Sequence, residues 1–330
     1  MSQPVGATSS EVKSLPSPAG RWSEVKTLPS PAGRWAGGEG YSPRKQVRQG
    51  LVLLLALCIF GPAAAAAGGT RVVRGGGALE MEVNSEFSRI RVRRQGNIRT
   101  LLFVRDSGEE VVESMLNVKK PYDLLVPYQR HMFASYLFRP KQEHVLLVGL
   151  GGGGMVHFLT HYDPAVHVDA VEIDPAVVKI AEGYFGVRSG GNVNIVTADG
   201  LQYLEKTDQQ YDVIYLDAFL KPAPDTDPTG MPLRLKTQRF YKDIQGKLKS
   251  EGLVVFNLNP HEGIDADIKT IRGAFAQVYV FRIADTNVVV VASPATQREQ
   301  PAVLKARAQQ ADRRFKATFS FAELLKNLAR

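Results

Sequence analysis

The stretch VLLVGLGGGGMVHFLTHYDPAVHVDAVEID, residues 145–174, carries the strongest fold signal in this 330-residue chain. An apolar run breaks into a glycine-rich segment, a helical segment follows, and a second apolar run ends in Glu172. This order of strand, glycine loop, helix, strand and acid is typical of a nucleotide-type ligand site. Glu172 falls at the predicted tip of the second strand, where its carboxylate can accept hydrogen bonds from both ribose hydroxyls.

The loop glycines Gly149, Gly151, Gly152 and Gly153 let the backbone approach a ligand that a Cβ atom would repel. Together with Gly154, the first two also match the spacing G-x-G-x-x-G. The loop alone therefore leaves three interpretations open: a nicotinamide dinucleotide site, another nucleoside site, or a tight turn that binds nothing.

The composition limits the classes of partner. Apolar residues make up 44% of the chain and charged residues 22%, which is ordinary for a globular protein. The formal net charge is +8, but residues 68–330 hold 34 basic and 30 acidic side chains, so no nucleic-acid partner is expected. Cys58 is the single cysteine, which excludes structural disulfides and cysteine-based zinc sites, and no metal site is expected.

Residues 1–67 are predicted to lie outside the folded part. SEVKSLPSPAGRW recurs at once as SEVKTLPSPAGRW, and because such a repeat cannot bury enough apolar area, residues 1–46 are predicted to be disordered, or to be translated sequence upstream of a natural start near Val47. Residues 47–67 have the layout of a signal peptide. We expect export to the periplasm and no stable membrane partner after cleavage. An uncleaved leader predicts an anchored or cytoplasmic protein instead.

Residues 68–140 are predicted to form a small N-terminal antiparallel β-domain and a linker. Apolar and polar residues alternate over 80–118, with turns at Gln95-Gly96-Asn97 and Asp106-Ser107-Gly108. The arginines of RIRVRR are expected on the solvated face of this sheet, and a face that steers substrate is the alternative.

Residues 141–293 alternate between strand-like and helix-like segments, which predicts a parallel sheet covered on both faces. Expected strands are 145–150, 167–173, 193–197, 211–217 and 252–258, and expected helices are 153–162, 175–185, 200–206, 237–249 and 264–275. The runs 277–283 and 287–293 are joined so closely that they must pair antiparallel. The sequence thus predicts an α/β, class I methyltransferase-like (Rossmann-like) seven-stranded sheet, disfavours a classical dinucleotide fold, and leaves 294–330 as a helical tail.

Three acids follow successive predicted strands, where open α/β sheets bind ligands. Glu172 ends the second strand, Asp199 follows the third and Asp217 follows the fourth. Asp199 can accept from an adenine amine or cap a helix, and the two roles are compatible. Asp217 closes YDVIYLDA, so it must be hydrogen-bonded, ion-paired or functional.

Further motifs complete an ordered set over about 80–293. They are the N-terminal β-domain, PYQRHM with Tyr128, VLLVGLGGGG, VEIDPAVV, Asp199-Gly200, YDVIYLDAF, Phe240-Tyr241 and GLVVFNLN. This set resembles the spermidine synthase (polyamine aminopropyltransferase) family, especially its divergent bacterial spermidine-synthase-like branch.

The resemblance implies a role for each motif. Glu172 would bind ribose, Asp199 and Gly200 would hold adenine, and the loop Gly149, Gly151, Gly152 and Gly153 would carry the nucleoside. Asp217 would activate the attacking amine, and Tyr128 and Tyr241 would lie near the substrates. The enzyme would move an aminopropyl group from decarboxylated S-adenosylmethionine, a cosubstrate, to a small polyamine, with no permanently bound cofactor, and would form a homodimer.

Two acids of the family pattern are missing here. Gly152 occupies the place of the aspartate that holds the aminopropyl amine, and Leu220 the place of a second acid after Asp217. Asp225 or Asp227 is the candidate replacement in the proline-rich loop. Two alternatives to aminopropyl transfer remain: a methyltransferase that uses ordinary S-adenosylmethionine, and a non-catalytic nucleoside or polyamine binding protein. The export leader favours the latter, because sulfonium donors are cytoplasmic.

Overall fold

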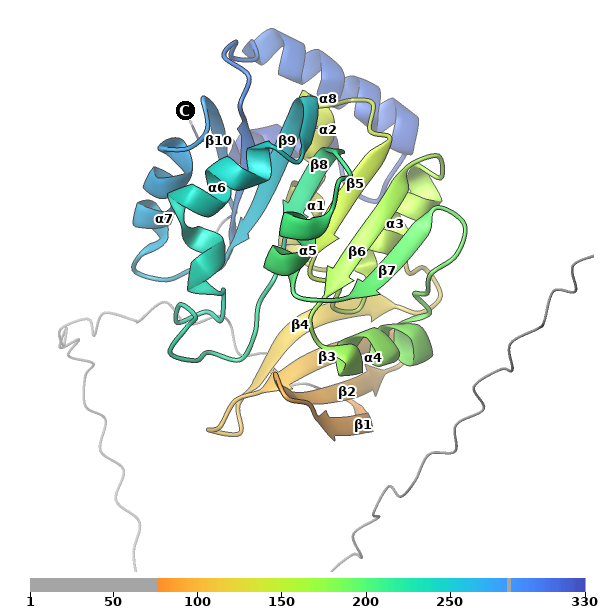
Figure 1. Cartoon of the computed structure of the whole chain (residues 1–330). Coiled ribbons are helices and arrows are strands. Elements are labelled where there is room, and N and C mark those ends of the chain that lie inside the picture. The colour runs from red at the N-terminus through yellow and green to blue at the C-terminus, as the bar shows by residue number, and fades with distance from the viewer. Residues whose placement is uncertain (1–75, 284–285, 330) are drawn as a thin grey trace, which may run out of the picture. The chain divides into compact units, whose positions relative to one another are not determined.

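The computed structural model describes residues 76–283 and 286–329, which belong to one compact unit. Within these ranges, four strands form an antiparallel sheet and seven form a mixed sheet (Figure 1). The repeat predicted at 1–46 and the leader predicted at 47–67 lie outside the described residues. None of the helices in the described ranges is long and apolar enough to cross a membrane.

The smaller sheet has the strand order β1-β2-β3-β4. Its strands are β1 (Ala78–Asn84), β2 (Arg89–Gln95), β3 (Ile98–Val104) and β4 (Glu110–Asn117). Both predicted turns are confirmed, since Gly96 and Gly108 adopt φ values of 61° and 82°, which favour glycine. Sequence alternation thus placed the N-terminal β-sheet correctly.

The arginines of β2 pair within their own sheet. Arg91 and Arg93 each donate to Glu110 at 2.8 Å, and Arg91 also donates to Glu82 at 3.0 Å. Cross-strand pairs of opposite charge stabilise a sheet modestly. Acids of the same sheet therefore neutralise Arg91 and Arg93.

The larger sheet has the strand order β10-β11-β9-β8-β5-β6-β7. Its strands are β5 (His144–Val148), β6 (His167–Glu172), β7 (Val193–Thr197), β8 (Tyr211–Leu216), β9 (Leu248–Leu258), β10 (Gln277–Arg282) and β11 (Val288–Ser293). The first five are parallel, and β11 pairs antiparallel with both β9 and β10. This topology confirms the predicted class I methyltransferase-like sheet.

Helices cover both faces of the sheet because the central strands, such as β5 and β8, are buried along almost their whole length and present apolar side chains to both faces. The helices are α1 (Pro127–Met132), α2 (Ser135–Phe138), α3 (Gly154–Tyr162), α4 (Pro175–Phe185), α5 (Gly200–Lys206), α6 (Gln238–Gln245), α7 (Ile264–Arg272), α8 (Pro301–Phe315) and α9 (Phe321–Leu324), with 3-10 turns η1 (Leu233–Lys236) and η2 (Leu325–Asn327). Val145 and Leu147 belong to the core with α1, α2, α3, α8 and α9, whereas Leu146 and Val148 face α5, α6 and α7.

Helix boundaries follow local capping chemistry. Asp174 accepts a hydrogen bond from the Ala176 amide at 2.8 Å and so begins α4. Ser320 accepts from the Glu323 amide at 3.3 Å and so caps the tail helix α9. The expected helix 237–249 is shorter in the structure, because α6 ends at Gln245 and β9 begins at Leu248.

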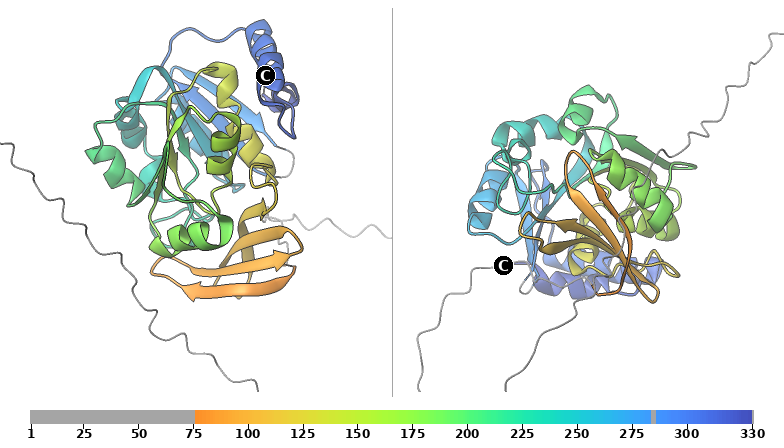
Figure 2. Two further views of the ribbon diagram at one scale, coloured as in Figure 1. Left: turned by 90° about the vertical axis from the view of Figure 1, so that its right-hand side faces the viewer. Right: turned by 90° about the horizontal axis from the view of Figure 1, so that it is seen from below.

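The smaller sheet lies at the end of the larger sheet opposite α8 (Figure 2). One side of it packs on α4, with Ile90 and Leu101 against Val177 and Ile180. The carboxyl ends of the parallel strands lie at this end, so β3 and β4 cover the edge at which α/β sheets bind ligands.

Candidate active site

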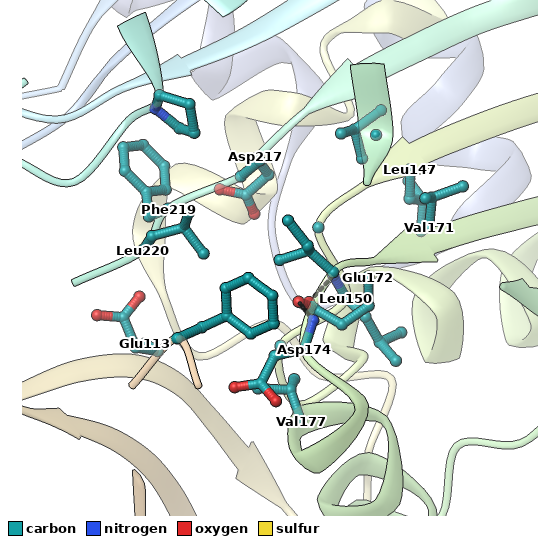
Figure 3. A pocket seen from close by; sticks show the side chains of 18 of the residues that line it. Glu113, Leu147, Leu150, Val171, Glu172, Asp174, Val177, Asp217, Phe219 and Leu220 are labelled. Atoms are coloured by element: carbon teal, nitrogen blue, oxygen red, sulfur yellow. Dashed lines mark hydrogen bonds between the residues drawn. The ribbon is translucent and has the colours of Figure 1, made fainter. Parts of the chain in front are cut away.

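A cavity lies between the carboxyl ends of β5, β6, β7 and β8 and the strands β3 and β4 (Figure 3). Its ionisable and hydrogen-bonding side chains come from both sheets. They are Ser88, Glu113, Ser114, Tyr128, Gln129, Glu172, Asp174, Asp199, Asp217 and Arg234. The sequence prediction that acids gather at this edge is therefore confirmed in space.

The glycine loop brings two strand ends together. Gly149 adopts φ 101°, and a Cβ there would lie 2.0 Å from the carbonyl oxygen of Asp217. Gly149 and Gly151 line the cavity, as expected. Gly152 instead packs against Ser114 and Phe185, and Gly153 serves as the N-cap of α3. The expectation of a ligand-facing surface thus fits the first half of the loop and not the second.

The Glu172 carboxylate fixes the glycine loop through backbone hydrogen bonds. Its Oε2 accepts from the Leu150 amide and its Oε1 from the Asp174 amide, each at 3.0 Å. Burial raises the pKa of this carboxyl above its ordinary value, and the backbone donors oppose that shift. A carboxylate offers about four acceptor positions. Glu172 thus keeps acceptor capacity for a ribose diol while fixing the loop.

Asp199 combines the two roles that the sequence left open. Its Oδ1 accepts from the Leu201 amide at 2.9 Å, so it caps α5. Asp199 and Gly200 also line the cavity, and Oδ2 of Asp199 pairs with Arg234 of η1. The N-terminus of α5 therefore forms part of the cavity wall.

Asp217 lies at the centre of the site, after β8. Its Oδ2 accepts from the Tyr128 hydroxyl at 3.1 Å, and its Oδ1 accepts from Asn257 Nδ2 at 2.8 Å. Burial raises the pKa of the Asp217 carboxyl, and these two donors only partly oppose the rise. In the described ranges no lysine, arginine or histidine forms an ion pair with Asp217. The site therefore presents an oriented acid without a resident cation.

Glu113 is a site residue that the sequence reasoning missed. It lies on β4 and lines the cavity from the side opposite the end of β8 (Figure 3). Burial raises the pKa of Glu113 to about 8, with further contributions from the charges of Asp217 and Glu172, against the opposing charge of Arg105. The available signal was an acid in the middle of the strand EVVESMLN, directly after the apolar pair Val111-Val112.

A second cavity adjoins the first. It runs between β3–β4 and the loops that follow β8 and β9, and it reaches Lys221, Asn259 and Asn287. The two cavities share Ser88, Phe103, Glu113, Tyr128, Phe219 and Leu220. Asp217 lies in the first cavity and hydrogen-bonds Tyr128 at this junction. The two compartments therefore meet beside two acids, Glu113 and Asp217.

Two expectations about the site require correction. Tyr241 lies in the core, 1% exposed and packed edge-on against Phe256, and it lines neither cavity. Asp225 and Asp227 line neither cavity either. The aromatic residue of α6 thus packs the helix on the sheet, and the proline-rich loop does not replace the missing acids.

Asp227 belongs to a separate ionic cluster. Lys236 Nζ lies 2.6 Å from Oδ2 of both Asp227 and Asp267, and His261 Nε2 lies 2.8 Å from Asp267. Asp227, His261 and Asp267 are the type of ligands that bind a metal, but the Lys236 ammonium already occupies the position between the two carboxylates. The cluster ties the loop after β8 to α7.

The site combines a methyltransferase-like sheet with two adjoining cavities that share Glu113 and Tyr128. Residues 127–319 match the family model of the spermine/spermidine synthase domain. The chain belongs to the spermine/spermidine synthase family.

Individual proteins show the same likeness. The chain is 33% identical over 206 residues to a polyamine aminopropyltransferase of Vibrio vulnificus, covering 61% of this chain and 67% of that one. Other proteins of the same name are matched over 60% and 62% of their length, so the chain spans less than two thirds of those relatives.

Solved structures share the fold. A spermidine synthase in complex with the transition-state analogue AdoDATO superposes with a TM-score of 0.57 at 18% identity, covering 76% of this chain and 85% of that one. Human methyltransferase-like protein 13 in complex with SAH has a TM-score of 0.54 at 25% identity, covering 59% of this chain and 95% of that one.

Proposed function

We propose that this protein transfers an aminopropyl group from decarboxylated S-adenosylmethionine to the amine of a polyamine. The observation that carries the proposal is Asp217, held by Tyr128 and Asn257 beside the glycine loop without a resident cation. Family membership and the name of the aligned relatives support this activity.

The chemistry requires an amine that has lost a proton. An alkyl amine has a pKa of about 10 and so arrives as an ammonium ion. The Asp217 carboxylate can orient that ammonium and accept its proton, and its raised pKa makes it a stronger base than an exposed aspartate. The nitrogen then forms a bond to the carbon next to sulfur, the carbon–sulfur bond breaks, and its electron pair leaves on neutral methylthioadenosine.

The remaining site residues have positioning roles in this proposal. Glu172 would accept the ribose hydroxyls, and Asp199 with Gly200 would contact adenine at the start of α5. Gly149 and Gly151 would allow the nucleoside to approach the backbone. Tyr128 would fix the orientation of Asp217 through its hydroxyl. Alignment of nitrogen, carbon and sulfur supplies much of the acceleration of such a displacement.

A methyltransferase is the second candidate, favoured by the likeness to human methyltransferase-like protein 13 and by the absence of an acid at Gly152. The charge of the cavity weighs against it. Glu172 and Asp217 have no ion-pair partner in the described ranges, and in their ionised forms they would repel the carboxylate of ordinary S-adenosylmethionine.

Calorimetry on the purified chain separates these candidates. We expect tighter binding of decarboxylated than of ordinary S-adenosylmethionine, and turnover with a diamine to give methylthioadenosine. Preference for the ordinary donor would support the methyltransferase. Binding of methylthioadenosine without turnover of any amine would indicate a non-catalytic binding protein.

We also propose export through the segment 47–67 and assembly as a homodimer. The leader pattern in the sequence supports export, and family resemblance supports the dimer. N-terminal sequencing of the native protein and its mass in light scattering test the two proposals. A native N-terminus upstream of residue 47, or a monomer at micromolar concentration, would contradict them.

A further inference from the structure

The two acids that the family pattern places in this site are absent here, and the structure explains one absence. A Cβ at Gly152 would lie 3.0 Å from both Ser114 Cβ and Phe185 Cδ1. The Gly152 amide also donates to Ser114 Oγ at 2.9 Å. Strand β4 therefore occupies the space into which a side chain at residue 152 would extend.

The same strand presents a different acid. Leu101 pairs with Ser114 and Leu102 with Val112, so Glu113 is the extra residue of a β-bulge. A bulge interrupts the alternation of a strand and redirects a side chain, and bulges are frequent beside active sites. Glu113 and its neighbour Ser114 consequently both line the first cavity.

The surroundings of Glu113 contain no internal partner for it. Over residues 76–283 and 286–329, the Glu113 carboxyl group takes part in no hydrogen bond or ion pair, and the charge of Arg105 acts on it only from a distance. Ser88, which lines both cavities with Glu113, is 4% exposed and its hydroxyl also lacks a hydrogen-bond partner among the described residues. Buried polar groups without partners are uncommon in native proteins, so the Ser88 hydroxyl beside Glu113 marks this junction as a candidate ligand contact.

We propose that Glu113, presented by the bulge in β4, binds the ammonium of the donor's aminopropyl chain in place of the acid missing at Gly152. The inference rests on the proposed function. Position favours the donor over the acceptor, because the adjacent Ser114 contacts the residue that the family pattern assigns to this ammonium. Burial beside Asp217 raises the pKa of Glu113, and an entering ammonium would favour its ionised form.

The inference also assigns donor selectivity to Glu113. The decarboxylated donor carries a sulfonium and an ammonium, whereas ordinary S-adenosylmethionine adds a carboxylate beside that ammonium. An ionised Glu113 attracts the ammonium and repels the carboxylate. Replacing its charge should therefore weaken one donor and not the other.

Glu113→Gln keeps the shape of the side chain and removes its charge. We expect the purified full-length variant to bind decarboxylated S-adenosylmethionine about 10- to 100-fold more weakly in calorimetry, as loss of a charged hydrogen bond implies. Methylthioadenosine, which lacks the aminopropyl chain, should bind within twofold of wild type and so reports an intact fold. Glu205→Gln, an exposed site on α5, is the matched control and should change neither affinity.

Each other outcome overturns the inference. Unchanged binding of the decarboxylated donor to Glu113→Gln, with wild-type turnover intact, removes the role of Glu113 and leaves the proposed function standing. A raised KM for the amine with unchanged donor affinity assigns Glu113 to the acceptor. If wild type binds neither the decarboxylated donor nor methylthioadenosine, the proposed function fails and the inference fails with it.

Discussion

Asp227 and Asp267 share the ammonium of Lys236, whereas Glu113, Glu172 and Asp217 have no ion-pair partner over the described ranges. Both groups are largely removed from water. Burial alone would raise the pKa of Asp227, yet the Lys236 ammonium and the Thr229 hydrogen bonds hold it below its ordinary value. The pKa values of the second group are all raised.

The difference separates an acid cluster that stabilises the fold from one that accepts a ligand. A buried carboxylate is costly unless a cation or hydrogen bonds compensate it. In the first cluster the chain supplies that cation itself. In the second cluster the compensation is incomplete, which suits a site for cationic substrates.

Removing the central acid should have the largest effect. Asp217→Asn preserves the shape between Tyr128 and Asn257 and abolishes the base. We expect kcat to fall about 10²- to 10⁴-fold, the usual contribution of a general base. Methylthioadenosine affinity should stay within a few-fold, as measured by calorimetry. Turnover near the wild-type rate would show that Asp217 has no catalytic role.

Removing the resident cation should chiefly affect stability. Lys236→Met leaves Asp227 and Asp267 without their shared ammonium, at a cost of about 3–5 kcal/mol in the free energy of unfolding. Urea unfolding measures this loss. Arg239→Met, which breaks the exposed pair with Asp243, is the control and should cause no measurable change. Equal stability of the two variants would contradict the structural role of the cluster.

Introducing the family's aspartate at residue 152 should destabilise the protein. Gly152→Asp forces a side chain against Ser114 and Phe185, and overpacking of this kind costs about 1–3 kcal/mol. Gly183 occupies an exposed position of α4, where a Cβ meets nothing within 4 Å. The control variant Gly183→Ala should therefore be neutral or slightly stabilising. Thermal unfolding of both variants tests the contrast, and a Gly152→Asp protein as stable as wild type would show that β4 can yield.

The raised pKa of Glu113 should appear as a small pH dependence of stability. Folded Glu113 retains its proton up to about pH 8, whereas the unfolded chain releases it near the ordinary value of 4.5. The folded state therefore binds more protons in this window, and stability falls as pH rises through it. We expect Glu113→Gln to reduce the loss between pH 5.5 and 8.5 by on the order of 1–2 kcal/mol. Parallel pH profiles would argue against the burial of this charge.

The architecture could be predicted from the sequence because it depends on local patterns of apolar and polar residues. Apolar runs at regular spacing gave the seven strands, and the close succession of β10 and β11 required antiparallel pairing. The positions of Glu172, Asp199 and Asp217 followed from one rule, since the carboxyl ends of parallel strands share an edge. Tyr128 came from family resemblance, and its contact with Asp217 is visible only in space.

What the sequence determined by itself is the class I methyltransferase-like sheet, its glycine loop and the acids at its strand ends, because apolar runs and chain connectivity fix them. Tertiary structure decided the rest. Glu113 reaches the cavity through a bulge that breaks the alternation on which sequence reasoning depends. Lys236, from a separate segment of the chain, forms an ion pair with Asp227. Packing between distant segments decides which acids form an ion pair within the protein and which have no such partner. No local sequence pattern encodes this packing.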